Sequence, residues 1–281
     1  MKVAFWSNEY EKSHAFHNFA AISIASVMSN PYTITVLENY LGRDNLGKAF
    51  FVDNDNIHAR SGGTCFYEGG GIEGLLRRIY RGDNDPSILR GYLKEVIPEH
   101  LYYIPKSGVI NSELFDYEMH NNLNELLGII TNSTDICYIN SSQQNHLSSK
   151  VILQEADIIV INLFQNPEYL EDFFKNYYSL IPKSIFIVGN YSPKSIMSCK
   201  RISKLYDIPI ENISPIPYNE YFHIACNFGG AKEFFNSNYF CTRESAHYLF
   251  IHGVRKAVYM ILKRVEESIL LDKEVMEYCG V

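Results

Sequence analysis

The sequence lacks three features that would place it in common functional classes: a long apolar run, a basic cluster and paired cysteines. No stretch approaches the roughly 20 apolar residues that a membrane span needs. The apolar run at residues 3–6 is also far shorter than the core of a secretory signal. The formal charge is −7 and no long run of lysine or arginine occurs. We therefore expect no DNA partner, because nonspecific binding to nucleic acid depends on clustered positive charge.

The cysteines are widely scattered and form no C-x-x-C pair, so they suggest neither a zinc site nor a disulfide framework. The six are Cys65, Cys137, Cys199, Cys226, Cys241 and Cys279. We therefore expect reduced cysteines in a cytoplasmic protein.

What the chain does contain is the pattern of a large α/β protein. With 281 residues and 46% hydrophobic content it can bury a full core, and we expect a single domain over residues 1–281. Short apolar runs alternate with longer stretches of helical period, which predicts a mostly parallel sheet of seven or eight strands with helices on both faces. Strands are predicted at 2–6, 33–37, 101–104, 136–139, 158–163, 185–188 and 213–215, with the first one central. Helices are predicted at 14–29, 72–80, 112–130, 168–178, 194–205 and 244–278.

The least regular region is Gly42–Gly71, which is rich in Asn, Asp and Gly and includes the run "RSGGTCFYEGGG". A functional loop and a plain surface connection both explain this composition. A second phosphate loop is not expected there, because no Lys-Ser or Lys-Thr pair follows the glycines.

The first predicted strand runs into a segment that has the spacing of a phosphate-binding loop without its glycines. The pattern G-x-x-x-x-G-K-[ST] requires glycines where this chain has Trp6 and Glu11, whereas Lys12 and Ser13 stand in the expected places. Glycines let backbone N–H groups close around an anion, but Glu9 and Glu11 would each bring a carboxylate against the phosphates. We therefore expect that this loop does not hold a phosphate.

The second half of the chain carries the most specific pattern. Four segments occur in order: "ADIIVINLFQNP" (156–167), "SIFIVGNYSPKS" (184–195), "ISPIPYN" (213–219) and "ACNFGGAKEFF" (225–235). Together they resemble the MinD/ParA family of deviant Walker ATPases, over nearly the whole chain. Within that family the start "KVAFWSN" and the series "FFKNYY", "FIVGNY" and "IPYN" look closest to TadZ/CpaE-type proteins of pilus assembly. The resemblance implies a P-loop NTPase fold of three layers.

The resemblance also aligns the opening segment with the family's phosphate loop. Lys12 and Ser13 fall on its Lys-Thr pair, while Ser7 falls on the deviant lysine that reaches the partner's nucleotide. The family's magnesium-arranging Asp corresponds to Asn140, and an amide does not supply the negative charge that a metal-bound water shell prefers. At the acidic position after the second strand only Glu38 could still act. Phosphoryl transfer depends on positioning and electrostatics, so these replacements together predict a loss of efficient hydrolysis.

The region that contacts adenine in the family is better retained. The matching residues here are Asn190, Pro217 and Tyr218. Local structure also explains them, because Asn is common where strands end and Pro is common in turns.

Two further features have a functional and a structural interpretation. His14 and His17 lie one helical turn apart and could ligate a metal, but no third ligand is evident and we expect a surface helix face. The terminal helix combines Arg255, Lys256 and other basic residues with a wide apolar face. It could lie on the inner face of a membrane, although amphipathic helices normally cover a sheet.

Two hypotheses follow. The favoured one is a scaffold that no longer hydrolyses nucleotide, needs no cofactor, and recruits pilus or secretion proteins, as a homodimer or a monomer. The other is a working ATPase that binds ATP and magnesium through Lys12 and Ser13. At the start of the first helix, we expect Glu11 or the hydroxyl of Ser13 to cap the free N–H groups.

Overall fold

The computed structural model describes residues 1–39, 45–52, 70–106, 111–141 and 146–279, with side chains described as far as residue 271. Its strands form one eight-stranded sheet in the order β3-β4-β2-β5-β1-β6-β7-β8. All neighbouring strands run parallel except β3 and β4, which are antiparallel. The strands are β1 Lys2–Trp6, β2 Ile34–Asn39, β3 Lys94–Ile97, β4 Leu101–Tyr103, β5 Ile136–Ser141, β6 Ile158–Phe164, β7 Ser184–Gly189 and β8 Ile213–Ile216. The predicted fold class and the central position of β1 are confirmed.

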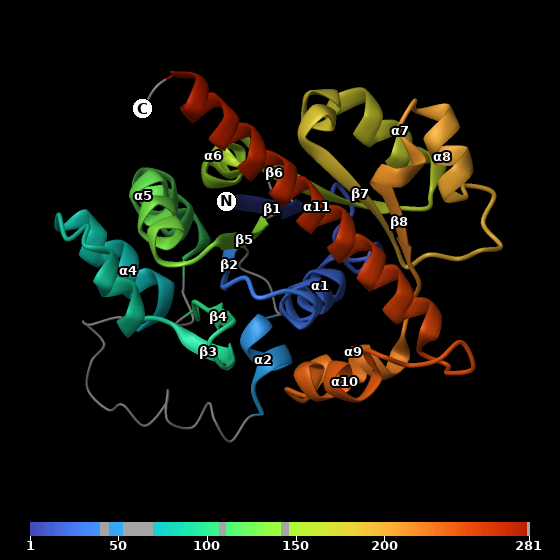
Figure 1. Cartoon of the computed structure of the whole chain (residues 1–281), viewed down its shortest axis with the longest axis horizontal. Helices are drawn as coiled ribbons and strands as arrows, with labels where there is room; N and C mark the ends of the chain where they lie inside the picture. The colour runs from blue at the N-terminus through green and yellow to red at the C-terminus, as the bar shows by residue number, and fades with distance from the viewer. Residues whose placement is uncertain (40–44, 53–69, 107–110, 142–145, 280–281) are drawn as a thin grey trace.

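Helices cover both faces of this sheet (Figure 1). One face carries α1 (Ala15–Ser29), α2 (Leu46–Phe50), α9 (Glu220–Asn227), α10 (Ala231–Asn238) and α11 (Tyr248–Cys279). The other face carries α4 (Gly71–Tyr80), α5 (Ser112–Ser133), α6 (Leu147–Glu155), α7 (Pro167–Asn176) and α8 (Cys199–Leu205). Short 3₁₀ turns lie at Pro86–Gly91, Tyr178–Lys183 and Ile210–Asn212.

Alternation along the buried strands produces the two cores. In β1, Val3 and Phe5 belong to the core beneath α1 and α11, while Ala4 and Trp6 belong to the core beneath α5 and α7. Successive side chains of a strand point to opposite faces, so a strand that is apolar throughout serves both layers. This explains why the apolar runs in the sequence are continuous rather than alternating.

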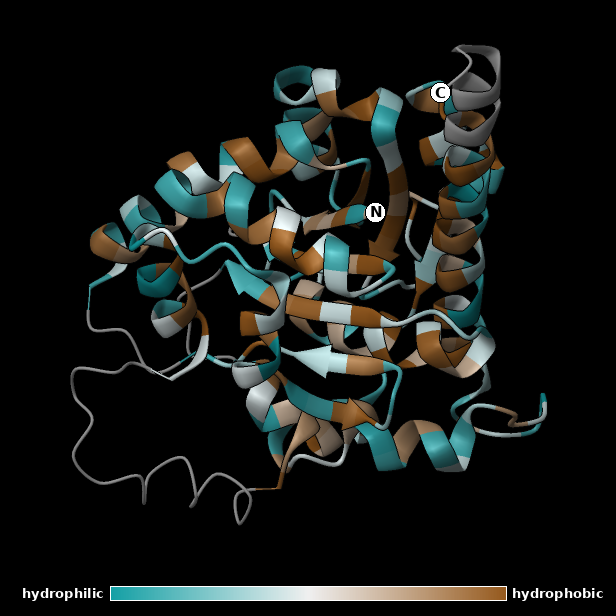
Figure 2. Cartoon of the chain, turned by 60° about the vertical axis from the view of Figure 1, so that its left-hand side comes forward, coloured by the Kyte–Doolittle hydropathy of each residue, from teal (hydrophilic) through white to brown (hydrophobic). Residues whose placement is uncertain are grey.

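The long helix α11 packs along α1 and β8, and its hydropathy alternates along its length (Figure 2). Buried residues on it include Val254, Ala257 and Ile261, so the inner half of its apolar face covers the protein core. Among the described residues, no helix is both long and apolar enough to cross a membrane.

Several local expectations need correction. The helix predicted from Lys194 begins only at Cys199, because Ser198 accepts a hydrogen bond from the Arg201 N–H and caps it there. The edge strand β3 and the short helices α2, α6, α9 and α10 were not expected. Of the irregular region Gly42–Gly71, residues 45–52 contain α2, and residues 42–44 and 53–69 lie outside the described part.

Candidate functional site

A loop of residues 7–14 leads from β1 to α1 at the carboxyl edge of the sheet. β5 and β6 flank β1, so their ends border this loop. Ligands of open parallel sheets bind at this edge. The loop ends at His14, which adopts the left-handed conformation with φ 55° before α1 begins at Ala15.

Buried amides hold the carbonyl side of the loop. The Ser13 carbonyl accepts hydrogen bonds from Asn18 Nδ2 at 3.2 Å and from Asn162 Nδ2 at 2.9 Å. The Ser7 hydroxyl donates to the Asn162 carbonyl at 2.6 Å. Gly189, which ends β7, lies so close that a Cβ there would collide with the Ser13 carbonyl. The loop backbone is therefore fixed from β6, β7 and α1 together.

Several N–H groups of the loop and the first N–H of α1 donate to acceptors that lie within the loop itself. Five N–H groups donate in this way, those of Glu9 and of residues 12–15. Their acceptors are Ser7 Oγ for Glu9, Glu9 Oε1 for Lys12, the Glu9 carbonyl for Ser13, the Glu11 carbonyl for His14 and the Tyr10 carbonyl for Ala15. Five of the donors that a phosphate could use at this loop and at the start of α1 are thus engaged by the protein's own oxygens.

Tyr10 fills the space between the loop and β5. Its side chain is 4% exposed, and its hydroxyl accepts a hydrogen bond of 2.6 Å from Asn140 Nδ2. The Ser13 hydroxyl, which would face a magnesium ion in a working phosphate loop, donates to the Tyr10 carbonyl at 3.3 Å. Asn140 and Ser13 are both buried. Tyr10 therefore contacts both positions at which relatives are expected to arrange magnesium, Ser13 through its backbone carbonyl and Asn140 through its hydroxyl.

The charged groups of the loop lie at its outer surface. Lys12 Nζ donates to the Tyr169 hydroxyl at 2.7 Å and lies 3.6 Å from Glu9 Oε2. The bond to Tyr169, together with the Glu9 carboxylate, raises the pKa of Lys12. The expectation that Glu11 or the Ser13 hydroxyl caps the N–H groups is wrong, because the N-cap of α1 is His14, which makes no side-chain capping bond, and the Ser13 hydroxyl donates to the Tyr10 carbonyl. The Glu9 side chain instead accepts from the Lys12 N–H at 3.4 Å, in the turn that precedes α1.

No family model matches the sequence, and no curated protein matches it significantly. Solved structures do match. A ParA family ATPase from Chlorobium tepidum superimposes with a TM-score of 0.66 at 13% identity, covering 92% of this chain and 98% of that one. MinD from Pyrococcus horikoshii complexed with Mg-ADP superimposes with a TM-score of 0.65 at 14% identity, covering 92% of this chain and 95% of that one. A chain of the MinC:MinD cell division protein complex of Aquifex aeolicus superimposes with a TM-score of 0.62 at 11% identity, covering 93% of this chain and 96% of that one.

The fold is that of MinD and ParA. At identities this low the likeness is one of fold, and it places the loop after β1 where a P-loop NTPase has its phosphate loop. What the MinD/ParA-like fold of this chain does there depends on its own residues.

Glu38, the acidic residue expected after the second strand, is the next-to-last residue of β2 and lies in a closed environment. Its side chain is fully buried, accepts hydrogen bonds from the Tyr103 hydroxyl at 2.8 Å and the Leu46 N–H at 3.2 Å, and lies 3.6 Å from Lys106 Nζ. Burial raises the pKa of Glu38, and Lys106 and Tyr103 oppose part of that rise. The Glu38 carboxylate thus joins β2 to β4 and to the start of α2 by hydrogen bonds, and it is not exposed to solvent.

The residues predicted to contact adenine gather beside the loop of the MinD/ParA-like fold. Asn190 adopts φ 48°, and its amide donates to the Lys12 carbonyl at 3.3 Å. Tyr218 is half exposed and packs edge-on against the ring of His14, with centroids 5.3 Å apart. Pro217, between β8 and Tyr218, is partly buried. Asn190 and Tyr218 therefore contact the loop, and Pro217 precedes Tyr218 in the chain.

Sequence reasoning missed four residues that shape the site: Tyr10, Asn162, Tyr169 and His223. Asn162 stands near the end of an apolar run in a quoted segment, and that position was available as a signal. Tyr10, Tyr169 and His223 carry no pattern in the sequence. Each acts through a contact with a partner that is distant along the chain or in an irregular turn.

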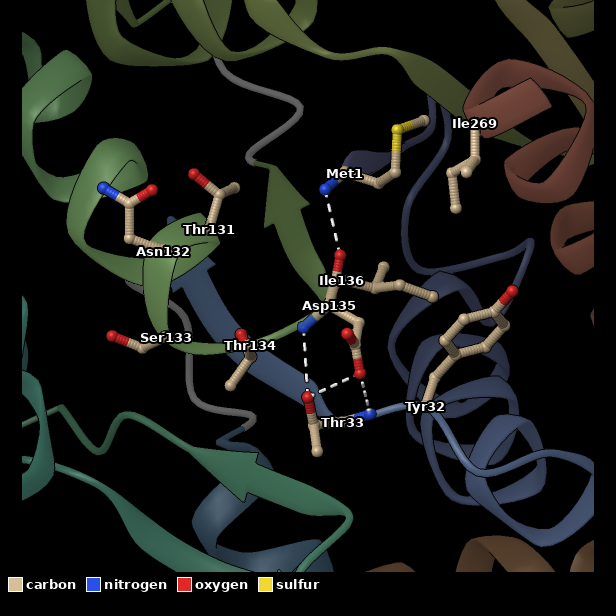
Figure 3. Close-up of a pocket in the computed structure, with 10 residues that line it drawn as sticks. All are labelled: Met1, Tyr32, Thr33, Thr131, Asn132, Ser133, Thr134, Asp135, Ile136 and Ile269. Carbon is tan, nitrogen blue, oxygen red and sulfur yellow. Dashed lines mark hydrogen bonds between the residues drawn. The ribbon is translucent and has the colours of Figure 1, made fainter. Parts of the chain in front are cut away.

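A separate surface hollow of about 400 Å³ lies at the opposite, amino edge of the sheet (Figure 3). The Asp135 carboxylate there accepts from both the N–H and the hydroxyl of Thr33 at 2.8 Å, and the Asp135 carbonyl accepts from the Met1 amino group at 3.0 Å. These bonds connect the strand starts to one another. The hollow therefore has a structural explanation and lies at the wrong edge for a nucleotide.

Proposed function

We propose that this chain is a MinD/ParA-like protein that no longer hydrolyses nucleotide and acts as a localisation or assembly scaffold, of the TadZ/CpaE type, for a pilus or secretion apparatus. The observation that carries the first part is the closed loop after β1. The N–H groups of Glu9 and of residues 12–15 donate to the loop's own oxygens, and Tyr10 occupies the space toward Asn140. Phosphate binding would require these bonds to break and the Glu9 carboxylate to leave.

Electrostatics support the same proposal. Glu9 and Glu11 place two carboxylates at the loop, and like charges a few ångströms apart cost on the order of 1–4 kcal/mol at surface dielectrics. Lys12 offsets only part of this, because its ammonium already contacts Glu9 and Tyr169. A triphosphate would add further negative charge to this surface.

The scaffold part rests on an apolar face that remains exposed beside the loop. Tyr221 and Ile224 of α9 and Phe228, which follows the last residue of α9, stand at helical spacing and are 66%, 48% and 74% exposed. Aromatic side chains are favoured in interface cores. We assign this face to a protein partner in the cytoplasm, either an assembly component or a second copy of the chain, with membrane contact through α11 as the alternative.

Titration calorimetry tests the proposal directly. ATP added with and without magnesium should give no saturable heat at concentrations up to about 1 mM, where binding energy is near 4 kcal/mol. The hydrolysis rate should equal that of Lys12→Ala and of a matched surface control, Lys175→Ala. Saturable ATP binding with turnover that disappears only in Lys12→Ala would replace the scaffold with the alternative, an ATPase that uses Lys12 and Ser13.

A further inference from the structure

Three histidines that are distant in the sequence meet beside the loop after β1; we call them the histidine cluster. His14 precedes α1, His17 lies in its first turn, and His223 lies in α9. His14 Nδ1 lies 3.0 Å from His223 Nε2, and the rings of His17 and His223 stack with centroids 3.6 Å apart. One ring nitrogen from each histidine lies within 4.8 Å of the other two. The sequence showed only His14 and His17 and predicted a surface helix face there; that expectation is wrong, because both rings are partly buried and contact His223.

Local structure holds these rings in place. His14 is kept in the left-handed region at φ 55°, a conformation that costs a side-chain-bearing residue roughly 1–2 kcal/mol. The Asn219 side chain caps α9 by accepting from the Phe222 N–H, which fixes the helix that carries His223. Tyr218 packs edge-on against His14 and His223. A strained residue that directs a ring into a cluster marks a position with a role beyond packing.

The cluster is poorly suited to positive charge. Burial lowers the pKa of His14, and burial together with neighbouring histidines lowers the pKa of His17 to about 4 and that of His223 to about 2. The imidazoles are therefore neutral at pH 7, and each keeps an in-plane lone pair. Among the described residues, no Asp or Glu joins this cluster.

We propose that His14, His17 and His223 bind one divalent transition-metal ion of the zinc class. Imidazole nitrogens suit Zn²⁺, Ni²⁺, Co²⁺ and Cu²⁺, whereas Mg²⁺ and Ca²⁺ require oxygen ligands. Three nitrogens complete three positions of a tetrahedral ion and leave the fourth open to water or another ligand. At a Zn–N distance of about 2.0–2.1 Å the nitrogens stand about 3.3 Å apart. Binding therefore requires His17 to turn out of its stack on His223, and it replaces the hydrogen bond between His14 and His223 with bonds to the ion.

The ion would link the start of α1 to α9, two segments separated by more than 200 residues. Because it binds the folded chain, adding it raises the thermal midpoint. The proposal does not depend on whether the loop binds nucleotide, since none of the three ligands is a phosphate-binding group.

The experiment uses the tag-free full chain after removal of metals with EDTA. Calorimetry with Zn²⁺ at pH 7.5 should give one ion per chain, and Co²⁺ should produce the visible absorption of a tetrahedral site. An excess of Mg²⁺ should not compete. Absence of saturable 1:1 Zn²⁺ binding by the unmodified protein overturns the proposal.

Variants locate the ion. His223→Ala and His17→Phe should each weaken Zn²⁺ binding by at least about tenfold, as the loss of a ligand requires. His17→Phe keeps a ring stacked on His223, so it separates loss of the ligand from loss of packing. The matched control is His252→Ala, an exposed histidine of α11 outside the cluster, which should bind as the unmodified protein does. Zn²⁺ binding that is unchanged in both cluster variants would show that the ion sits elsewhere and would also overturn the proposal.

Discussion

Tyr10→Phe is the sharpest test of the closed loop, because it removes one hydroxyl and keeps the ring. That hydroxyl accepts from Asn140 Nδ2 at 2.6 Å inside the protein. A buried donor that loses its partner costs about 1–3 kcal/mol, so Tyr10→Phe should lower the free energy of unfolding by that amount. For a chain of this size the thermal midpoint should fall by several degrees, at roughly 2–4 °C per kcal/mol.

A double-mutant cycle with Asn140→Ala assigns the loss to this pair. Unfolding in denaturant should show the double variant about 1 kcal/mol more stable than the sum of the two single losses, beyond the roughly 0.3–0.5 kcal/mol spread of independent sites. Tyr218→Phe, which alters a half-exposed tyrosine, should change stability by less than about 0.5 kcal/mol. Additive losses at Tyr10 and Asn140 would mean that the phenol does not close the loop, and the argument against phosphate binding would lose its main support.

Two further outcomes follow from the same region. The pKa of His17 is lowered to about 4 in the folded chain from an ordinary value near 6.5, so only the unfolded chain binds this proton between those pH values. The contribution of His17 to the free energy of unfolding is therefore complete above about pH 7 and declines toward pH 4. Over that range the free energy of unfolding should decline less steeply in His17→Phe than in the unmodified protein, by up to about 1.4 kcal/mol per pH unit. Parallel curves for the two proteins would refute the lowered pKa. Gly189→Ala should cost at least about 1–3 kcal/mol in thermal unfolding, because its Cβ collides with the Ser13 carbonyl, whereas Gly91→Ala, which meets open space, serves as the control.

The sheet was predictable because its central strands are buried on both faces. Runs such as Ile158–Ile161 are apolar throughout because they serve two cores, and that continuity is visible in one sequence. The edge strand Lys94–Ile97 was missed because it is short, partly exposed and mixed in composition. Short helices such as Ala231–Asn238 were missed since tertiary contact, more than a long periodic pattern, defines them.

The chemistry of the loop was predictable only in part. Glu9 and Glu11 stand where phosphate loops have glycines, which predicts that the loop does not bind a phosphate. That prediction needs only the residue types. Which glutamate accepts the N–H groups depends on where α1 begins. The left-handed turn at His14 delays that start to Ala15, and such a turn at a histidine is not readable from composition.

The same turn connects the closed loop with the histidine cluster. Because His14 is left-handed, its N–H donates back to the Glu11 carbonyl and that of Ala15 to the Tyr10 carbonyl, which occupies the donors at the start of α1. The conformation also directs the His14 ring toward His223 rather than along the helix. A metal on the cluster would therefore stabilise the backbone state in which the loop is closed, and Zn²⁺ should protect the amides of residues 12–15 from hydrogen exchange. Unchanged exchange of these amides on saturation with Zn²⁺ would separate the two features.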